Sequence, residues 1–144
     1  MGLDMYLLDG QEYKEYKEKI RKCDPDSSEI WRIPFPTELI YWRKANAIHR
    51  YFCSIGKEIE KDLIYEISKD QLLELVDFIK LILNSRDSDG DIFAKLIIPI
   101  QDGPFFGSIG YDEYYYSDLE YTKEKIESIL KLSNRDSFIY YASW

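Results

Sequence analysis

The segment KDQLLELVDFIKLILNS (69–85) constrains the fold most, because as a helix it is apolar around most of its circumference. Ser68 and Gln71 form a capping box that predicts where this helix begins. Its narrow polar side consists of Asp70, Glu74, Asp77, Lys80 and Asn84. Such a helix needs apolar neighbours on several sides, so we expect it to be the central and most buried helix of the protein.

Short apolar or aromatic segments at both ends of the chain are typical of strands. GLDMYLL (2–8) stops at Asp9-Gly10, which indicates a turn, and SFIYYASW (137–144) has a clear strand composition. LIYEI (63–67) predicts a third strand. The segment 101–116 contains three glycines among aromatic residues, which predicts bent strand pieces.

Further helices are indicated by their terminal residues. Thr37 as N-cap predicts a helix that runs to about Ile55, with Gly56 just past its end. A capping box at Ser117 and Glu120 predicts another helix, which buries Leu119, Ile126, Ile129 and Leu130.

Other segments are less specific. Residues 11–22 fit a solvated helix or an exposed strand, and residues 91–98 fit a short helix or a strand. The three prolines in residues 23–36 predict a loop with one extended piece at EIWRI (29–33), and RDSDGD (86–91) predicts a second loop. Interspersed helices and strands without a linker or repeat predict a single α+β domain over residues 1–144. We expect a small sheet with helices packed mainly on one side.

Charge and cysteine content exclude several functions. There are 27 acidic and 19 basic residues, a net charge of −8, which argues against direct sequence-specific nucleic-acid binding and leaves a basic partner open. Two cysteines and one histidine cannot form a closed zinc site, so we expect no metal and no cofactor. The chain shows neither a signal-peptide pattern nor an apolar run of membrane-spanning length, so we expect a soluble protein with free thiols and no membrane partner.

The first candidate site is YWRKANAIHRYF (41–52), placed on the predicted helix. A helical wheel puts Tyr41, Ala45, Ile48 and Phe52 in a core stripe. A neighbouring face, rich in hydrogen-bond donors, suits an anionic ligand or simply pairs with the protein's own carboxylates. This face consists of Trp42, Arg43, Asn46 and Arg50.

His49 falls at the edge of the core stripe, where a histidine packs its ring and makes one hydrogen bond, or else binds or catalyses. Cys53 lies one turn later, but any helix gives that spacing, and no third group is evident to orient a Cys-His dyad. We therefore assign no catalytic residue.

The second candidate site is the acidic and tyrosine-rich segment GYDEYYYSDLEY (110–121). If exposed, it could imitate nucleic acid in a basic groove of a partner. Alternatively, its acids stabilise a helix N-terminus and its tyrosines fill a sheet face. The residues we assign to binding here are Asp112, Glu113, Tyr114, Tyr115 and Tyr116.

Four segments in this order, MGLDMYL, YWRKANAIHRYF, FFGSIGYDEYYYSDLEYT and YYASW, resemble a family of small uncharacterised proteins encoded by bacteriophages and prophages. The resemblance implies a viral accessory protein that works in the cytoplasm of a bacterial host. It brings no activity, cofactor or catalytic residue with it.

Together these observations predict a non-enzymatic phage or prophage protein that inhibits a host defence system. We expect it to be anti-CRISPR-like and to occupy a site on a host protein or ribonucleoprotein effector. One alternative is a protein that binds or sequesters a nucleotide or another small anion, and another is an enzyme centred on His49. The sequence leaves the oligomeric state open.

Overall fold

The computed structural model describes residues 2–59, 63–86 and 91–144. Strands and helices are interspersed along the chain, and the predicted α+β class is confirmed. The elements, in chain order, are β1 (Asp4–Asp9), α1 (Gly10–Lys22), η1 (Ser28–Arg32), β2 (Glu38–Arg43), α2 (Asn46–Ile55), β3 (Lys57–Ile59), β4 (Ile64–Ser68), α3 (Lys69–Ser85), α4 (Ile92–Ile97), α5 (Glu113–Leu132) and β5 (Ser137–Ser143).

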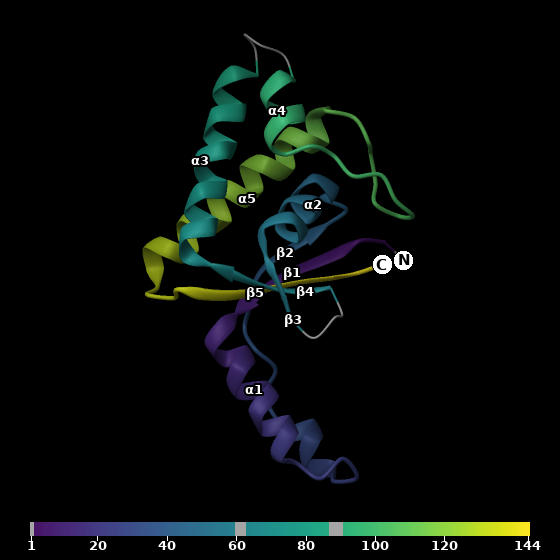
Figure 1. Ribbon diagram of the computed structural model, residues 1–144, viewed down its shortest axis with the longest axis vertical. Coiled ribbons are helices and arrows are strands. Elements are labelled where there is room, and N and C mark those ends of the chain that lie inside the picture. Colours follow the sequence, from purple (N-terminus) through teal and green to yellow (C-terminus); the bar gives the residue numbers. More distant parts are fainter. Residues whose placement is uncertain (1, 60–62, 87–90) are drawn as a thin grey trace.

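The strands form one antiparallel sheet in the order β2-β1-β5-β4-β3. The central pair, β1 and β5, therefore comes from opposite ends of the chain. Helices α2, α3, α4 and α5 lie on one side of the sheet, while α1 leaves from the other side (Figure 1). Because alternate residues of a strand point to opposite faces, the sheet has a covered face and a more open face.

The main core lies between the covered face and the helices. Met5, Trp42 and Tyr140 from three neighbouring strands are buried there, and Phe52 of α2 stacks on Tyr140 with ring centroids 4.7 Å apart. Helix α3 packs along α5 and presents one apolar side to this core. Its buried side consists of Leu72, Leu75, Val76, Ile79 and Ile82. Two leucines of α3, Leu73 and Leu81, are 43% exposed, so its apolar circumference is only partly covered.

Several elements follow the sequence prediction. Strands β1, β4 and β5 form where expected, and the capping box of α3 is present. In it, the Ser68 hydroxyl accepts from the Gln71 backbone N–H (3.1 Å), and the Gln71 side chain accepts from the Ser68 N–H (2.9 Å). Residues 11–22 and 91–98, for which the sequence left helix or strand open, both contain helices, α1 and α4.

The helix predicted from Thr37 to Ile55 is wrong in its first half. Residues 38–43 instead form β2, whose register places Trp42 opposite Met5 of β1. Lys44 then adopts a left-handed backbone conformation (φ 57°), and its N–H donates to the Leu3 carbonyl (2.7 Å), so no helix continues through it. Within the predicted span only α2 is helical, and this helix ends at Ile55, before Gly56, as predicted.

The starts of two helices also differ from the prediction. Asp9-Gly10 is no turn: Asp9 is the N-cap of α1, and its carboxylate accepts from the Glu12 N–H (2.9 Å). Helix α5 begins at Glu113 with Asp112 as N-cap, so the capping box predicted at Ser117 and Glu120 lies inside the helix.

Two predicted extended segments have other structures. EIWRI (29–33) falls mostly within the 3₁₀ helix η1. The segment 101–112 forms no strand and wraps as a loop toward α5, with Gly107 at φ 92°. In the predicted loop 86–91, residues 87–90 lie outside the described part. Across residues 2–59, 63–86 and 91–144, no helix combines the length and apolarity needed to cross a bilayer.

Candidate functional site

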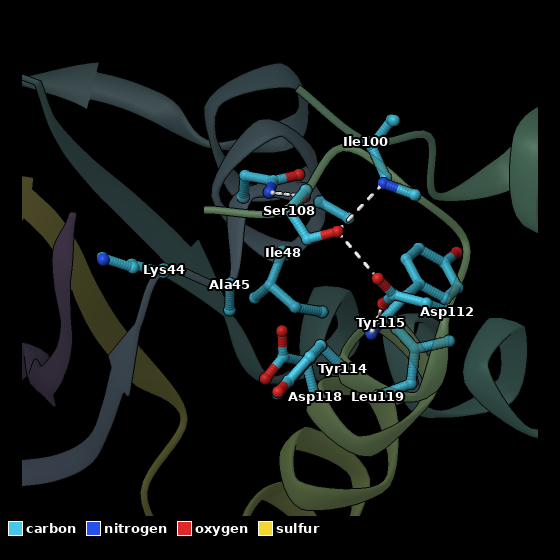
Figure 2. A pocket seen from close by; sticks show the side chains of 13 residues that line it. Lys44, Ala45, Ile48, Ile100, Ser108, Asp112, Tyr114, Tyr115, Asp118 and Leu119 are labelled. Carbon is cyan, nitrogen blue, oxygen red and sulfur yellow. Dashed lines mark hydrogen bonds between the residues drawn. The ribbon is translucent and has the colours of Figure 1, made fainter. Parts of the chain in front are cut away.

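The two stretches singled out from the sequence meet at one small cleft. Its walls come from residues 44–48 at the start of α2, from the loop that contains Ile100 and Ser108, and from the first turns of α5 (Figure 2). Its free volume of about 30 Å³ holds one or two water molecules, whereas small-molecule pockets typically measure about 300–1,000 Å³. A nucleotide therefore does not fit inside this cleft.

Asn46 joins the cleft walls through three hydrogen bonds. Its side-chain N–H₂ group donates to the carbonyls of Phe106 (3.1 Å) and Ser108 (2.8 Å), and its side-chain oxygen accepts from the Gln101 N–H (3.0 Å). Asn46 is buried, and these bonds hold the loop before α5 against the start of α2. Its amide is therefore occupied by the protein's own backbone.

Of the predicted donor face, Arg50 lies one turn after Asn46 on α2 and shares its face, whereas Trp42 and Arg43 lie on β2 and point elsewhere. Trp42 points into the core, where its indole N–H donates to the Thr122 hydroxyl (2.8 Å). Arg43 lies on the open side of the sheet, 3.8 Å from Asp4, and Arg50 donates to the Ile100 carbonyl (2.9 Å). The expected face is wrong for Trp42 and Arg43, because it assumed one continuous helix through residues that form β2.

The tyrosine-rich segment is less exposed than the second site hypothesis requires. Asp112 caps α5 by accepting from the Tyr115 N–H (3.2 Å), and Glu113 pairs with Arg86. Tyr115 and Tyr116 are buried, and only Tyr114 is largely exposed, at 76%. The predicted acidic residues therefore serve mainly the start of α5, and their role in binding stays a prediction.

Two carboxyl groups at the cleft have pKa values shifted in opposite directions. The Ser108 hydroxyl, 2.7 Å away, and the Tyr115 N–H lower the pKa of Asp112. Asp118 points into the cleft from one turn and a half further along α5 (Figure 2), where burial and the nearby charge of Asp112 raise its pKa to about 6. Such divergent pairs occur at functional sites and also in structural networks.

His49 is buried, as the packing alternative for this residue predicts. Its Nδ1 is 2.6 Å from the Tyr140 hydroxyl, its ring packs against Phe106 and Trp144, and burial lowers its pKa to about 4. The sulfur of Cys53 lies 3.7–3.8 Å from the ring nitrogens, but burial raises the pKa of this thiol. An activated cysteine needs the opposite shift, so the geometry favours packing over nucleophilic catalysis.

A feature that the sequence reasoning missed lies on the open face of the sheet. Tyr6 of β1 stands opposite Tyr41 of β2 and Tyr141 of β5 in the strand register. Its ring centroid is 5.3 Å from that of Tyr41 and 4.7 Å from that of Tyr141, with the latter pair stacked. We call these three residues the tyrosine row.

The tyrosine row is accessible. Tyr41 is 37% exposed and the other two rings are half-buried, packed beside Leu8 and Ile139. In β2 exposed and buried positions alternate in the structure, but the helix predicted there placed Tyr41 in the core stripe. In β1 and β5 both faces carry large apolar or aromatic side chains, so alternation gives little signal.

Within the described residues, no group of three or more histidine, cysteine, aspartate or glutamate side chains is placed to hold a metal ion. The chain matches no protein-family model, no curated protein and no solved structure. The candidate sites therefore rest on the geometry of the chain alone.

Proposed function

We propose that this protein is a binding protein whose macromolecular partner docks on the open face of the sheet. The tyrosine row carries this proposal. The exposed face of an antiparallel sheet ordinarily alternates to polar residues, but here three neighbouring strands present aromatic rings. Tyrosine is enriched at interfaces because it offers a large apolar ring and a hydroxyl that forms hydrogen bonds.

The biological setting that we propose is a phage or prophage protein that inhibits a host defence effector, as an anti-CRISPR protein does. Its support is the resemblance of the four sequence segments and the excess of acidic residues, which suits a basic effector surface. Expression of the protein in a CRISPR-protected bacterium should raise the plating efficiency of a targeted phage. Unchanged plating efficiency across several CRISPR types would remove this setting and leave the binding role standing.

The binding role is tested by removing two rings of the tyrosine row. The double variant Tyr41→Thr, Tyr141→Thr keeps residues that favour strands and removes most of the aromatic surface. We expect the stoichiometric partner captured from bacterial lysate by the wild-type protein to be lost with this variant. Circular dichroism and thermal unfolding establish that the variant is folded.

The control is Leu132→Ala, which removes an exposed apolar side chain (80%) from the end of α5, outside both candidate sites and the tyrosine row. This control should retain the partner. Equal capture by the double variant and the wild type would exclude the tyrosine row as the docking surface.

A further inference from the structure

The open face of the sheet already accepts one helix of the chain itself. Tyr13, in the first turns of α1, packs on Leu8 and Ile139, and Lys14 beside it lies 3.7 Å from the carboxylate of Glu66 on β4. The face therefore binds an amphipathic helix through an aromatic contact flanked by a lysine–carboxylate pair. This contact occupies only one end of the face, since α1 then leads away from the sheet (Figure 1).

The neighbouring part of the face, the tyrosine row, also combines apolar surface with carboxylates, but here the aromatic rings belong to the sheet. Two carboxylates lie beside its rings: Asp4, which accepts from the Tyr41 hydroxyl (2.5 Å), and Glu38. Burial and then the negative charges of Asp4 and Glu38 raise the pKa of Tyr6. Tyr141 is affected by burial, by Tyr6 and by Glu38 in the same direction. The charges of Asp4 and Glu38 therefore act on the rings of the row, with Arg43 opposing them at Tyr41.

The basic groups on this face are largely matched. Arg43 lies beside Asp4, and Lys57 of β3 stands opposite Glu66 in the strand register, away from the row. Glu38 is exposed and forms no ion pair with any residue that the structure describes. It is thus the carboxylate most available to a partner.

We propose that the tyrosine row binds an amphipathic helix of a partner protein that presents lysine or arginine to Glu38. This inference rests on the proposed function and adds the chemistry of the partner. The dimensions agree, since three strands about 4.8 Å apart span about 10 Å, close to the width of one helix. The net charge of −8 adds a long-range attraction for a basic partner.

The test uses two helical peptides with the same leucine face, one with lysine and one with glutamate on the polar face. Binding to the full-length protein is measured by fluorescence anisotropy, and a single-stranded oligonucleotide is the third probe. We expect the lysine peptide to bind best, with perturbed NMR signals at Tyr6, Tyr41 and Tyr141. The Glu38→Lys variant should bind it about tenfold more weakly.

The control variant Glu74→Lys makes the same charge change on α3, on the other side of the sheet, and should leave the lysine peptide's affinity nearly unchanged. A charge-swap result would be decisive, because Glu38→Lys should bind the glutamate peptide better than the wild type does. Equal effects of the two variants, or preference for the oligonucleotide or the glutamate peptide in the wild type, would overturn the inference.

These outcomes separate the two proposals. If capture of a lysate partner depends on the tyrosine row but the lysine peptide shows no preference, the partner chemistry is wrong and the docking surface stands. If neither lysate partner nor peptide depends on the row, both proposals fail.

Discussion

At the scale of single residues, most polar side chains of the cleft beside α2 form hydrogen bonds within the protein itself. Asn46 forms its hydrogen bonds with the backbone of the loop, and Asp112 accepts a hydrogen bond from the backbone of α5. Asp118 differs, because its carboxyl group is half-buried and makes no ion pair with any described residue. It is therefore the residue of this cleft whose ionisation opposes folding.

The raised pKa of Asp118 gives a pH-dependent loss of stability. Between about pH 4 and pH 6, the folded state keeps a proton that the unfolded state has released, so the free energy of unfolding falls as the pH rises. Asp118→Asn abolishes this ionisation. At pH 7 the variant should therefore be more stable than the wild type by about 1–2 kcal/mol, a figure reduced for solvent screening at a half-buried group.

Urea unfolding of both proteins at pH 4 and pH 7 measures this effect, and the difference should shrink at the lower pH. His49, with its lowered pKa of about 4, gives a slope of the opposite sign, but both proteins share it. Glu120→Gln removes an exposed charge from the same helix and serves as the control. A constant difference at the two pH values would contradict the assigned role of Asp118.

At the scale of elements, one side chain ties the start of α1 to the segment that leads into β5. Asp9 ends β1, caps α1 through the Glu12 N–H and accepts from the guanidinium of Arg135 at 2.6 Å. It is buried, so both contacts act where water competes little. The direction in which α1 leaves the sheet depends on this residue.

Two substitutions at Asp9 separate its contacts. Asp9→Asn keeps an oxygen that can cap α1 but removes the charge facing Arg135, and we expect a loss of about 1 kcal/mol in unfolding free energy. Asp9→Ala removes both contacts and should cost about 2–4 kcal/mol. Chemical denaturation measures both variants. Equal losses would mean that the ion pair, and not the cap, carries the stabilisation.

The elements also show what the sequence could and could not predict. Local signals sufficed for α3, because Ser68 and Gln71 are adjacent partners in one capping box. They failed for residues 38–43, which have an acceptable helical pattern but pair with β1 residues that lie 30 to 39 positions earlier in the chain. The cleft was anticipated only as two separate segments, since nothing local to Asn46 reveals that its partners are residues 101–108.

At the scale of the whole molecule, the protection of backbone amides from hydrogen exchange should follow the position of each strand in the sheet. Strands β1 and β5 are hydrogen-bonded on both sides, whereas β3 is a three-residue strand at the edge and α1 extends away from the body (Figure 1). Amides at the sheet centre open only with global unfolding, while edge and projecting elements open locally.

Hydrogen exchange followed by NMR tests this order. The amides of Leu7 and Tyr140 should exchange slowest, and those of β3 and of residues 14–22 should exchange orders of magnitude faster. Comparable protection of α1 and β5 would contradict it and indicate that α1 is held by contacts along its whole length.

The place of β5 has a consequence for how the chain folds. Without it, β1 pairs only with β2 and β4 only with β3, so the sheet falls into two ladders with no hydrogen bond between them. Insertion of β5 closes the largest loop in the molecule and joins both ladders in one step. Folding should therefore be slow for a chain of this size, with a transition state in which residues 137–143 are already docked.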